Sequence, residues 1–210
     1  MPIFDDVFRD KFIELLKWRR DVRRFKADPV PPKLLDDLLT AADLAPSVGL
    51  SQPWRFVTVD DPGRRSAIRR NFEACNKDAL AHMYGERAAS YAQLKLAGLD
   101  EAPCHLAVFA ETAPVQGHGL GRRTMPETLN YSTVIAVHTL WLLARTSELG
   151  LGWISILDPI QAAQALDVPP SWNFIGYFCV GYPQEENQVP ELELLEWEHR
   201  QITAVHHLKR

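Results

Sequence analysis

The chain has 210 residues, of which 46% are hydrophobic, and this length predicts one domain with a sizeable core. A formal net charge of -4 and a pI near 6.0 argue against a general nucleic-acid binder. Three cysteines far apart in the sequence do not make a disulfide framework. Because the seven histidines show no ligand spacing, we expect no metal.

The N-terminal residues are too charged for a signal peptide. Residues 128–144 lack charges, but this stretch includes polar residues and is shorter than the ~20 apolar residues that span a bilayer. We therefore expect a soluble, cytoplasmic protein without a membrane partner.

Apolar residues at helical and strand spacing predict an irregular alternation of elements. In chain order we expect a helix at 4–16, a helix at 33–45, a strand at 54–59, a turn at 61–63, an irregular helical region at 64–99, a strand at 104–110, a loop at 114–126, a helix at 128–150, a strand at 153–157, a helix at 159–166 and a strand at 174–180. This order disfavours a regular doubly wound fold and predicts one α+β domain over residues 1–210, ending in an extended tail at 184–210.

The predicted helix at 128–150 is the longest, and apolar residues lie on nearly all its sides. Such a helix must be buried all round, in the core or at a subunit interface. Before it, the segment from Gly117 to Gly121 has glycine at every second position. This pattern is not the full dinucleotide fingerprint, and Pro126 separates it from the next helix, so we interpret it as a flexible loop.

A basic segment follows the first predicted helix. Six of the ten residues from 17 to 26 are Lys or Arg, on a chain with a negative net charge. The planar donor fork of Arg matches a phosphate, so the cluster indicates an anion site, although a solvated helix end is the alternative. Asp21 would repel a phosphate and therefore predicts contact with another part of the ligand.

Several motifs together resemble the nitroreductase family of FMN proteins. They are Arg19-Arg20-Asp21-Val22-Arg23, Ala45-Pro46-Ser47-x-x-x-Ser51-Gln52-Pro53-Trp54, the long helix with Leu149-Gly150-Leu151-Gly152 after it, and a basic residue near the C-terminus. Further stretches are similar to the subgroup that makes 5,6-dimethylbenzimidazole, namely residues 94–96, 121–128, 131–132 and 152–157. Ordinary family members tend to have Ser or Thr in place of Asp21, and often Pro in place of Ser155.

The resemblance covers essentially the whole chain and implies a nitroreductase-like fold, with a mixed central sheet surrounded by helices. It also implies an obligate homodimer with one FMN site at each end of the interface. The helix at 128–150 would then be the interface helix, in contact with its own copy across a two-fold axis.

The same resemblance implies the flavin contacts. Arg19, Arg20 and Arg23 would hold the phosphate and ribityl chain, with Arg200 as a further phosphate ligand. The other implied contacts are Asp21, Val22, Pro46, Ser47, Val48, Gly49, Leu94, Ser155 and Ile156. Of these, the turn at 46–49 is expected to come from the other subunit.

The subgroup uses O2 to fragment reduced FMN into 5,6-dimethylbenzimidazole, the lower ligand of cobalamin, and erythrose 4-phosphate. FMNH2 would thus be a substrate. Asp21 is the only ionisable acid in the flavin motif and is the candidate general base or proton shuttle, while Ser155 would position the ring. Residues 71–99 would form a lid that leaves no room for a nicotinamide, so a separate flavin reductase would supply FMNH2.

Two other functions remain open at this stage. One is an NAD(P)H-dependent nitroreductase or quinone reductase that keeps its FMN, and the other is a non-catalytic flavin-binding protein. Asp21 and Ser155 together favour the synthase over both.

Overall fold

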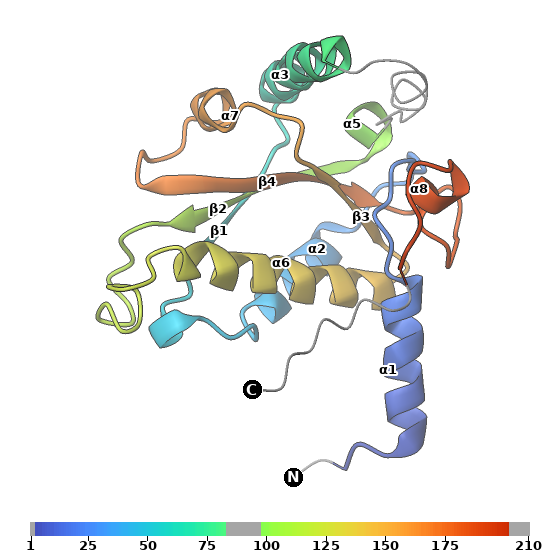
Figure 1. Ribbon diagram of the computed structural model, residues 1–210, viewed down its shortest axis with the longest axis horizontal. Helices are drawn as coiled ribbons and strands as arrows, with labels where there is room; N and C mark the ends of the chain where they lie inside the picture. The colour runs from blue at the N-terminus through green and yellow to red at the C-terminus, as the bar shows by residue number, and fades with distance from the viewer. Residues whose placement is uncertain (1–2, 83–97, 202–210) are drawn as a thin grey trace.

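The computed structural model describes residues 3–82 and 98–201. Among these residues, four strands form an antiparallel sheet in the order β1-β2-β4-β3 (Figure 1). The strands are β1 (Trp54–Thr58), β2 (Cys104–Glu111), β3 (Gly150–Ile154) and β4 (Trp172–Gly181). The predicted α+β class is confirmed.

Helices cover both faces of this sheet (Figure 1). The described helices are α1 (Asp6–Trp18), α2 (Pro32–Ala42), the short 3-10 helix η1 (Val48–Leu50), α3 (Pro62–Ala81), α5 (Gly98–Glu101), α6 (Thr128–Thr146), α7 (Pro159–Leu166) and α8 (Glu191–Leu194). The pair α2 and α6 packs on one face, and α3 packs with α7 on the other. The sheet is therefore the middle of three layers.

The central strand β2 explains why the core has two halves. Leu106 and Val108 point into the cluster shared with α2 and α6, whereas Ala107 and Phe109 point into the cluster shared with α3 and α7. Successive side chains of a strand alternate between the two faces of the sheet, so a strand covered on both faces needs a continuous apolar run. The uninterrupted apolar run of residues 106–110 reflects that position.

The parallel component expected of a mixed sheet comes from a single bridge. All four described strands pair antiparallel, and Asp21 adds a parallel bridge to Leu151 at the free edge of β3. The amide of Val22 donates to the carbonyl of Leu151 at 2.9 Å. The basic segment is thus joined to the sheet.

The segment around residues 61–81 differs from the prediction. The expected turn at 61–63 is wrong, because Pro62 begins α3 and the Asp61 side chain caps it by accepting from the Arg64 amide at 2.7 Å. An aspartate before a proline is a helix start as well as a turn motif. The irregular region expected from residue 64 is a regular helix as far as Ala81, and residues 83–97, including Leu94, lie outside the described residues.

The long helix α6 also differs from the prediction. It has 19 residues against 20 in α3, and it is not buried all round. Tyr131, Val134 and Ile135 are 54%, 37% and 42% exposed. They share one stripe because residues three and four apart lie on the same helix face, so none of the described residues covers this apolar face of α6.

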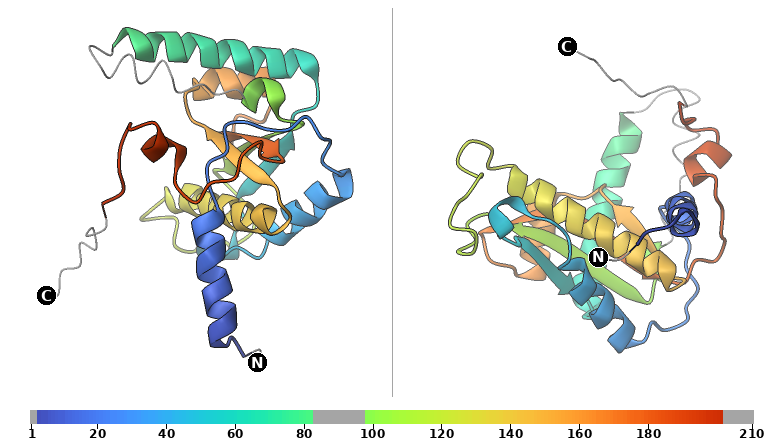
Figure 2. Two further views of the ribbon diagram at one scale, coloured as in Figure 1. Left: turned by 90° about the vertical axis from the view of Figure 1, so that its right-hand side faces the viewer. Right: turned by 90° about the horizontal axis from the view of Figure 1, so that it is seen from below.

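The first helix, α1, also has apolar residues that the rest of the described structure leaves exposed. No residue of α1 is buried, and its apolar residues Phe8 and Phe12 are 49% and 43% exposed. The helix projects away from the sheet and its covering helices (Figure 2). Large apolar patches of this kind mark interaction surfaces.

One buried histidine predicts a pH dependence of stability. His105 on β2 is 2% exposed, and its Nδ1 lies 2.9 Å from the hydroxyl of Tyr177. Burial, together with the positive charge of Arg65, lowers the pKa of His105 to about 4. His105 is protonated less readily in the folded state than in the unfolded state. Its contribution to the free energy of unfolding is therefore fully present above the unfolded pKa of about 6.5 and is lost as the pH falls toward 4.

We expect the free energy of unfolding to fall by about 2–3 kcal/mol through His105 alone between about pH 7 and pH 4.5. The measurement is urea denaturation at both pH values. His105→Gln cannot titrate and should remove this part of the loss, whereas His82→Gln, at an exposed position, should keep the wild-type difference. Equal pH dependence in the wild type and His105→Gln would contradict the assignment.

Candidate functional site

The basic segment leaves α1 at its C-cap, Arg19, and continues in extended conformation beside β3. Further on, the amide of Lys26 donates to the carbonyl of Tyr182 at 2.8 Å, and the amide of Gln184 donates to the carbonyl of Arg24 at 3.1 Å. The segment is therefore fixed between β3 and the chain that follows β4. Because backbone hydrogen bonds hold the segment on both sides, its side chains are available to contact a ligand.

Glycine in β3 permits this close approach. A Cβ at Gly152 would lie 2.1 Å from the carbonyl oxygen of Val22. A Cβ at Gly150 would lie 2.5 Å from the Cγ2 of the same valine. Any larger residue would displace the segment. The Gly150-x-Gly152 part of the predicted motif thus has a packing role that sequence reasoning did not identify.

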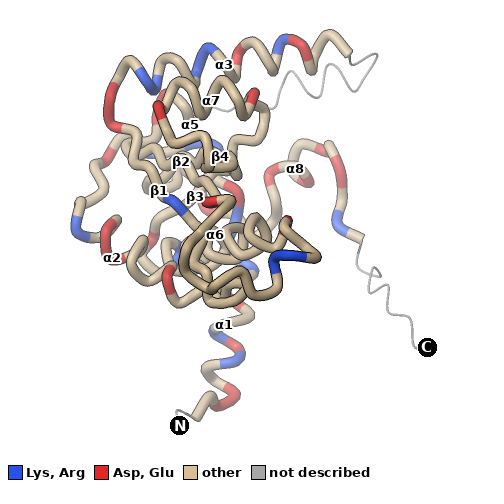
Figure 3. Tube along the Cα trace, turned by 90° about the vertical axis from the view of Figure 1, so that its left-hand side faces the viewer, with Lys and Arg blue, Asp and Glu red and all other residues tan. Residues whose placement is uncertain are grey.

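Four arginines line one cavity of about 170 Å³. They are Arg19, Arg20, Arg23 and Arg200, and the remaining lining includes Asp21 and Glu191. The cavity lies where α8 and the tail after it meet the basic segment, and Figure 3 shows acidic residues on α8 followed by a basic one in the tail. The structure thus brings together the four arginines that the sequence predicted as phosphate ligands.

Arg23 has unused donor capacity inside this cavity. Its side chain is 12% exposed, and its Nη1 is buried without a hydrogen-bond partner among the described residues. Its Nε lies 3.6 Å from Glu191 Oε2 and 3.9 Å from Asp21 Oδ2, beyond hydrogen-bond length. A buried unpaired guanidinium donor is costly unless an anion meets it.

Arg19 and Arg20 are held by other contacts. Arg20 donates from Nε to the carbonyl of Gln188 at 2.7 Å, and from Nη1 to the carbonyl of Arg19 at 2.6 Å. The guanidinium carbon of Arg19 lies 4.9 Å from the ring centroid of Trp141. Burial, with the like charges of Arg200 and Arg19, lowers the pKa of Arg20. This repulsion between cations also favours an anion in the cavity.

Asp21 is held by the sheet edge. Its Oδ1 accepts a hydrogen bond from the amide of Trp153 at 2.8 Å. Burial raises the pKa of Asp21 above its usual value, although the Trp153 amide and the charge of Arg23 act in the opposite direction. A carboxyl group with a raised pKa is better matched to taking and giving protons near neutral pH.

Ser155 and Ile156 directly follow β3. Ser155 is exposed and Ile156 is half-buried. Asp21 is bonded to Trp153, only two residues before Ser155, so the two catalytic candidates lie along the same edge. No hydrogen bond joins their side chains in the structure.

The turn with Pro46, Ser47, Val48 and Gly49 lies elsewhere in the chain. The Val48 amide donates to Ser132 Oγ on α6, whereas the basic segment contacts Trp141 of the same helix, whose Nε1 donates to the Arg20 carbonyl. Nine residues correspond to about 14 Å along a helix axis. One chain therefore does not bring this turn to the arginine cavity, and Leu94 lies outside the described residues.

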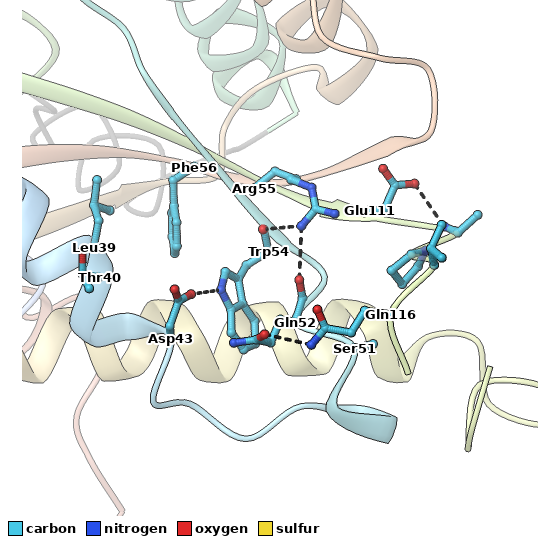
Figure 4. Close-up of a pocket in the computed structure, with 13 residues that line it drawn as sticks. Leu39, Thr40, Asp43, Ser51, Gln52, Trp54, Arg55, Phe56, Glu111 and Gln116 are labelled. Atoms are coloured by element: carbon cyan, nitrogen blue, oxygen red, sulfur yellow. Dashed lines mark hydrogen bonds between the residues drawn. The ribbon is translucent and has the colours of Figure 1, made fainter. Parts of the chain in front are cut away.

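A second hollow, of about 650 Å³, lies beside β1 (Figure 4). Its polar groups are largely paired within the chain: Asp43 accepts from Trp54 Nε1 at 2.6 Å, and Arg55 donates to the carbonyl of Gln52 at 3.1 Å. Because it has no cluster of like charges, we place the candidate site at the arginine cavity instead.

The parts of the chain that the structure describes contain no group of three or more His, Cys, Asp or Glu residues placed to hold a metal ion. None of the described helices is long and apolar enough to cross a membrane. Sequence reasoning also missed Glu191 and Trp141 as neighbours of the arginines. The acidic composition of the tail was the only sign of Glu191, and no sequence pattern pointed to Trp141.

Comparison with known proteins identifies the family. The Nitroreductase family model matches residues 16–182. The 5,6-dimethylbenzimidazole synthase of Rhodospirillum rubrum is 56% identical over 199 residues, which cover 95% of this chain and 94% of that protein. A protein of the same name from Rhodobacter capsulatus is 46% identical over 195 residues, covering 93% and 94%.

Solved structures agree with this match. The crystal structure of oxidized iodotyrosine deiodinase bound to FMN and 3-iodo-L-tyrosine superposes with a TM-score of 0.74 at 25% identity, covering 94% of this chain and 99% of that one. Since the family model spans most of the chain and the similarity to the first two relatives extends over nearly its full length, this protein belongs to the nitroreductase family.

Proposed function

We propose that this chain is a 5,6-dimethylbenzimidazole synthase, an oxidoreductase of cobalamin biosynthesis that takes reduced FMN and O2 as substrates. The 56% identity to a relative of that name over nearly the whole chain supports the reaction. The structural observation that carries the proposal is the arginine cavity with Asp21 at its wall.

The cavity fits the phosphate of FMN. Its four arginines outnumber the nearby carboxylates of Asp21, Glu191 and Glu193, so a positive charge remains that favours a phosphate. The buried Nη1 of Arg23 offers a donor that has no partner in residues 3–82 and 98–201. Charge-assisted bonds from guanidinium groups to phosphate are among the stronger hydrogen bonds in proteins.

Asp21 is the group that moves protons in this proposal. When bound, reduced FMN supplies the reaction with O2 in which its ring is fragmented and ribityl C1′ becomes C2 of the product. Asp21 lies at the boundary between the arginine cavity and the edge of β3, where the ribityl chain would meet the ring. Ser155, exposed at the end of the same strand, would orient the ring.

A second copy of the chain would complete the site. The turn at 46–49 contacts α6 nine residues away from the Trp141 that meets the basic segment, and the apolar faces of α6 and α1 lack cover among the described residues. We propose that these faces form a homodimer in which the turn of one subunit lines the flavin held by the other. The lid expected at 71–99, of which residues 83–97 lie outside the described residues, and a separate flavin reductase belong to the same proposal.

An NAD(P)H-dependent nitroreductase or quinone reductase that keeps its FMN is the second candidate. The NADH dehydrogenase of Thermus thermophilus is 33% identical over 179 residues, covering 80% of this chain and 84% of that protein. This lower identity, and the aspartate at position 21, favour the synthase.

Product analysis tests the reaction. Protein mixed with photoreduced FMN and air should yield 5,6-dimethylbenzimidazole and erythrose 4-phosphate on chromatography. NADH or NADPH alone should not reduce the bound flavin at a useful rate, because a closed lid excludes the nicotinamide. Stopped-flow bleaching by either nucleotide at roughly 1–1000 per second, without benzimidazole formation, would favour the second candidate.

Arg23 and Asp21 should separate binding from chemistry. Arg23→Ala should raise the Kd for FMN by tenfold or more, because charge-assisted hydrogen bonds are worth roughly 1.5–3 kcal/mol each. Asp21→Asn keeps an oxygen for the Trp153 amide, so it should retain FMN and lose about 100-fold or more of product formation. Lys26→Ala, an exposed cation of the same segment outside the cavity, is the control for charge. Near wild-type yield in Asp21→Asn would remove the proton-transfer role.

Ile135→Glu tests the dimer. Placing a charge on the apolar face of α6 should produce a monomer in sedimentation velocity and weaken flavin binding, since a buried unpaired charge costs several kcal/mol. Ile160→Glu is the matched control, because Ile160 is 69% exposed on α7 and lies on the other face of the sheet. A monomeric wild type that still binds FMN would contradict the dimer.

A further inference from the structure

The glycine loop from Gly117 to Gly121 packs against the turn that contains Val48 and Gly49. A Cβ at Gly117 would lie 2.6 Å from the carbonyl oxygen of Gly49, and one at Gly121 would lie 2.8 Å from Val48 Cγ2. The contact is reciprocal, because a Cβ at Gly49 would lie 2.8 Å from the carbonyl oxygen of Leu120. At Gly49 and Gly117 the two backbones touch, and only glycine leaves both in place, whereas Gly121 faces the Val48 side chain.

Three hydrogen bonds hold the same turn from its sides. Gln116, the residue before the loop, donates from Nε2 to the carbonyl of Leu50 at 2.6 Å and to Gln52 Oε1 at 2.9 Å, the latter bond being drawn in Figure 4. Ser132 of α6 accepts from the Val48 amide at 3.0 Å. The turn is thus supported by the glycine loop, by a glutamine and by a helix.

We propose that Gly117 and Gly121 are positioning residues for the reaction: they set how far the turn at Val48 and Gly49 projects toward the flavin ring. The inference rests on the proposed function, in which this turn lines the ring. A side chain on the loop would displace the turn from the position that it has in the structure. Misplacement by about 1 Å can cost about 100-fold in rate.

The chain offers a matched control for backbone strain. Gly117, Gly119 and Gly121 have φ of +82°, +77° and +78°, so alanine is strained to a similar extent at all three. At Gly119, however, a Cβ would meet only the flexible Arg122 side chain, at 3.6 Å from its Nε. Gly119→Ala therefore reports the strain without the collision.

The experiment compares Gly117→Ala and Gly121→Ala with Gly119→Ala. Each purified variant is titrated with FMN, its visible flavin circular dichroism is recorded, and product formation is measured at saturating FMNH2. We expect the first two to change the flavin spectrum and lower turnover per bound flavin by about 10- to 100-fold. Gly119→Ala should resemble the wild type in both.

A compensating substitution keeps the test independent of folding. Gly121→Ala collides only with the Val48 side chain, so adding Val48→Ala should restore the flavin spectrum and part of the turnover, giving a favourable coupling between the two sites. A variant that is merely less stable would lower the amount of bound flavin, but not the turnover of each bound flavin or its spectrum.

The outcomes distinguish a failure of the proposed function from a failure of the positioning role. A wild type without benzimidazole formation would remove the proposed function, whatever the variants do. An active wild type with Gly117→Ala and Gly121→Ala indistinguishable from Gly119→Ala would overturn the positioning role and leave the function intact.

Discussion

The structure depends on the backbone contact between the basic segment and β3. The backbone of this segment can lie so close to a strand only if the strand presents no side chain there, and Gly152 meets that condition. The bridge from Asp21 to Leu151 and the bond to the Trp153 amide then fix the direction of every side chain that follows. Alternation along the segment sends Asp21 and Arg23 to the same cavity.

Concentrating cations in this cavity has an electrostatic cost that the chain offsets in part. Glu191 approaches Arg23, and Glu193 lies 3.7 Å from the Nε of Arg200, so α8 supplies carboxylates without saturating the guanidinium groups. A phosphate dianion would complete the balance, whereas a neutral ligand would leave Arg23 with its buried donor unmet. The partial pairing of the arginines with carboxylates would thus account both for affinity for a phosphorylated flavin and for the stability of the cavity without a ligand.

Glycines serve the candidate site in two separate places. In β3 they admit the basic segment, and in the loop before α6 they admit the turn with Val48 and Gly49. The first place was visible in the sequence as part of a family motif. The second resembled an incomplete dinucleotide loop, because a sequence pattern records which residues are glycines but does not identify the neighbour that comes close to them.

By itself, the sequence determined the class of fold, most element positions and the cluster of Arg19, Arg20 and Arg23, since periodicity and charge clusters are local properties. The grouping of these arginines with the distant Arg200 was implied only by the family resemblance. Only the tertiary structure decided which apolar residues of α6 stay exposed, that Asp61 starts a helix, and that one chain separates the turn at 46–49 from the arginines. These features depend on which surfaces meet in space. Burial and distance are properties of the packed chain, and no local pattern encodes them.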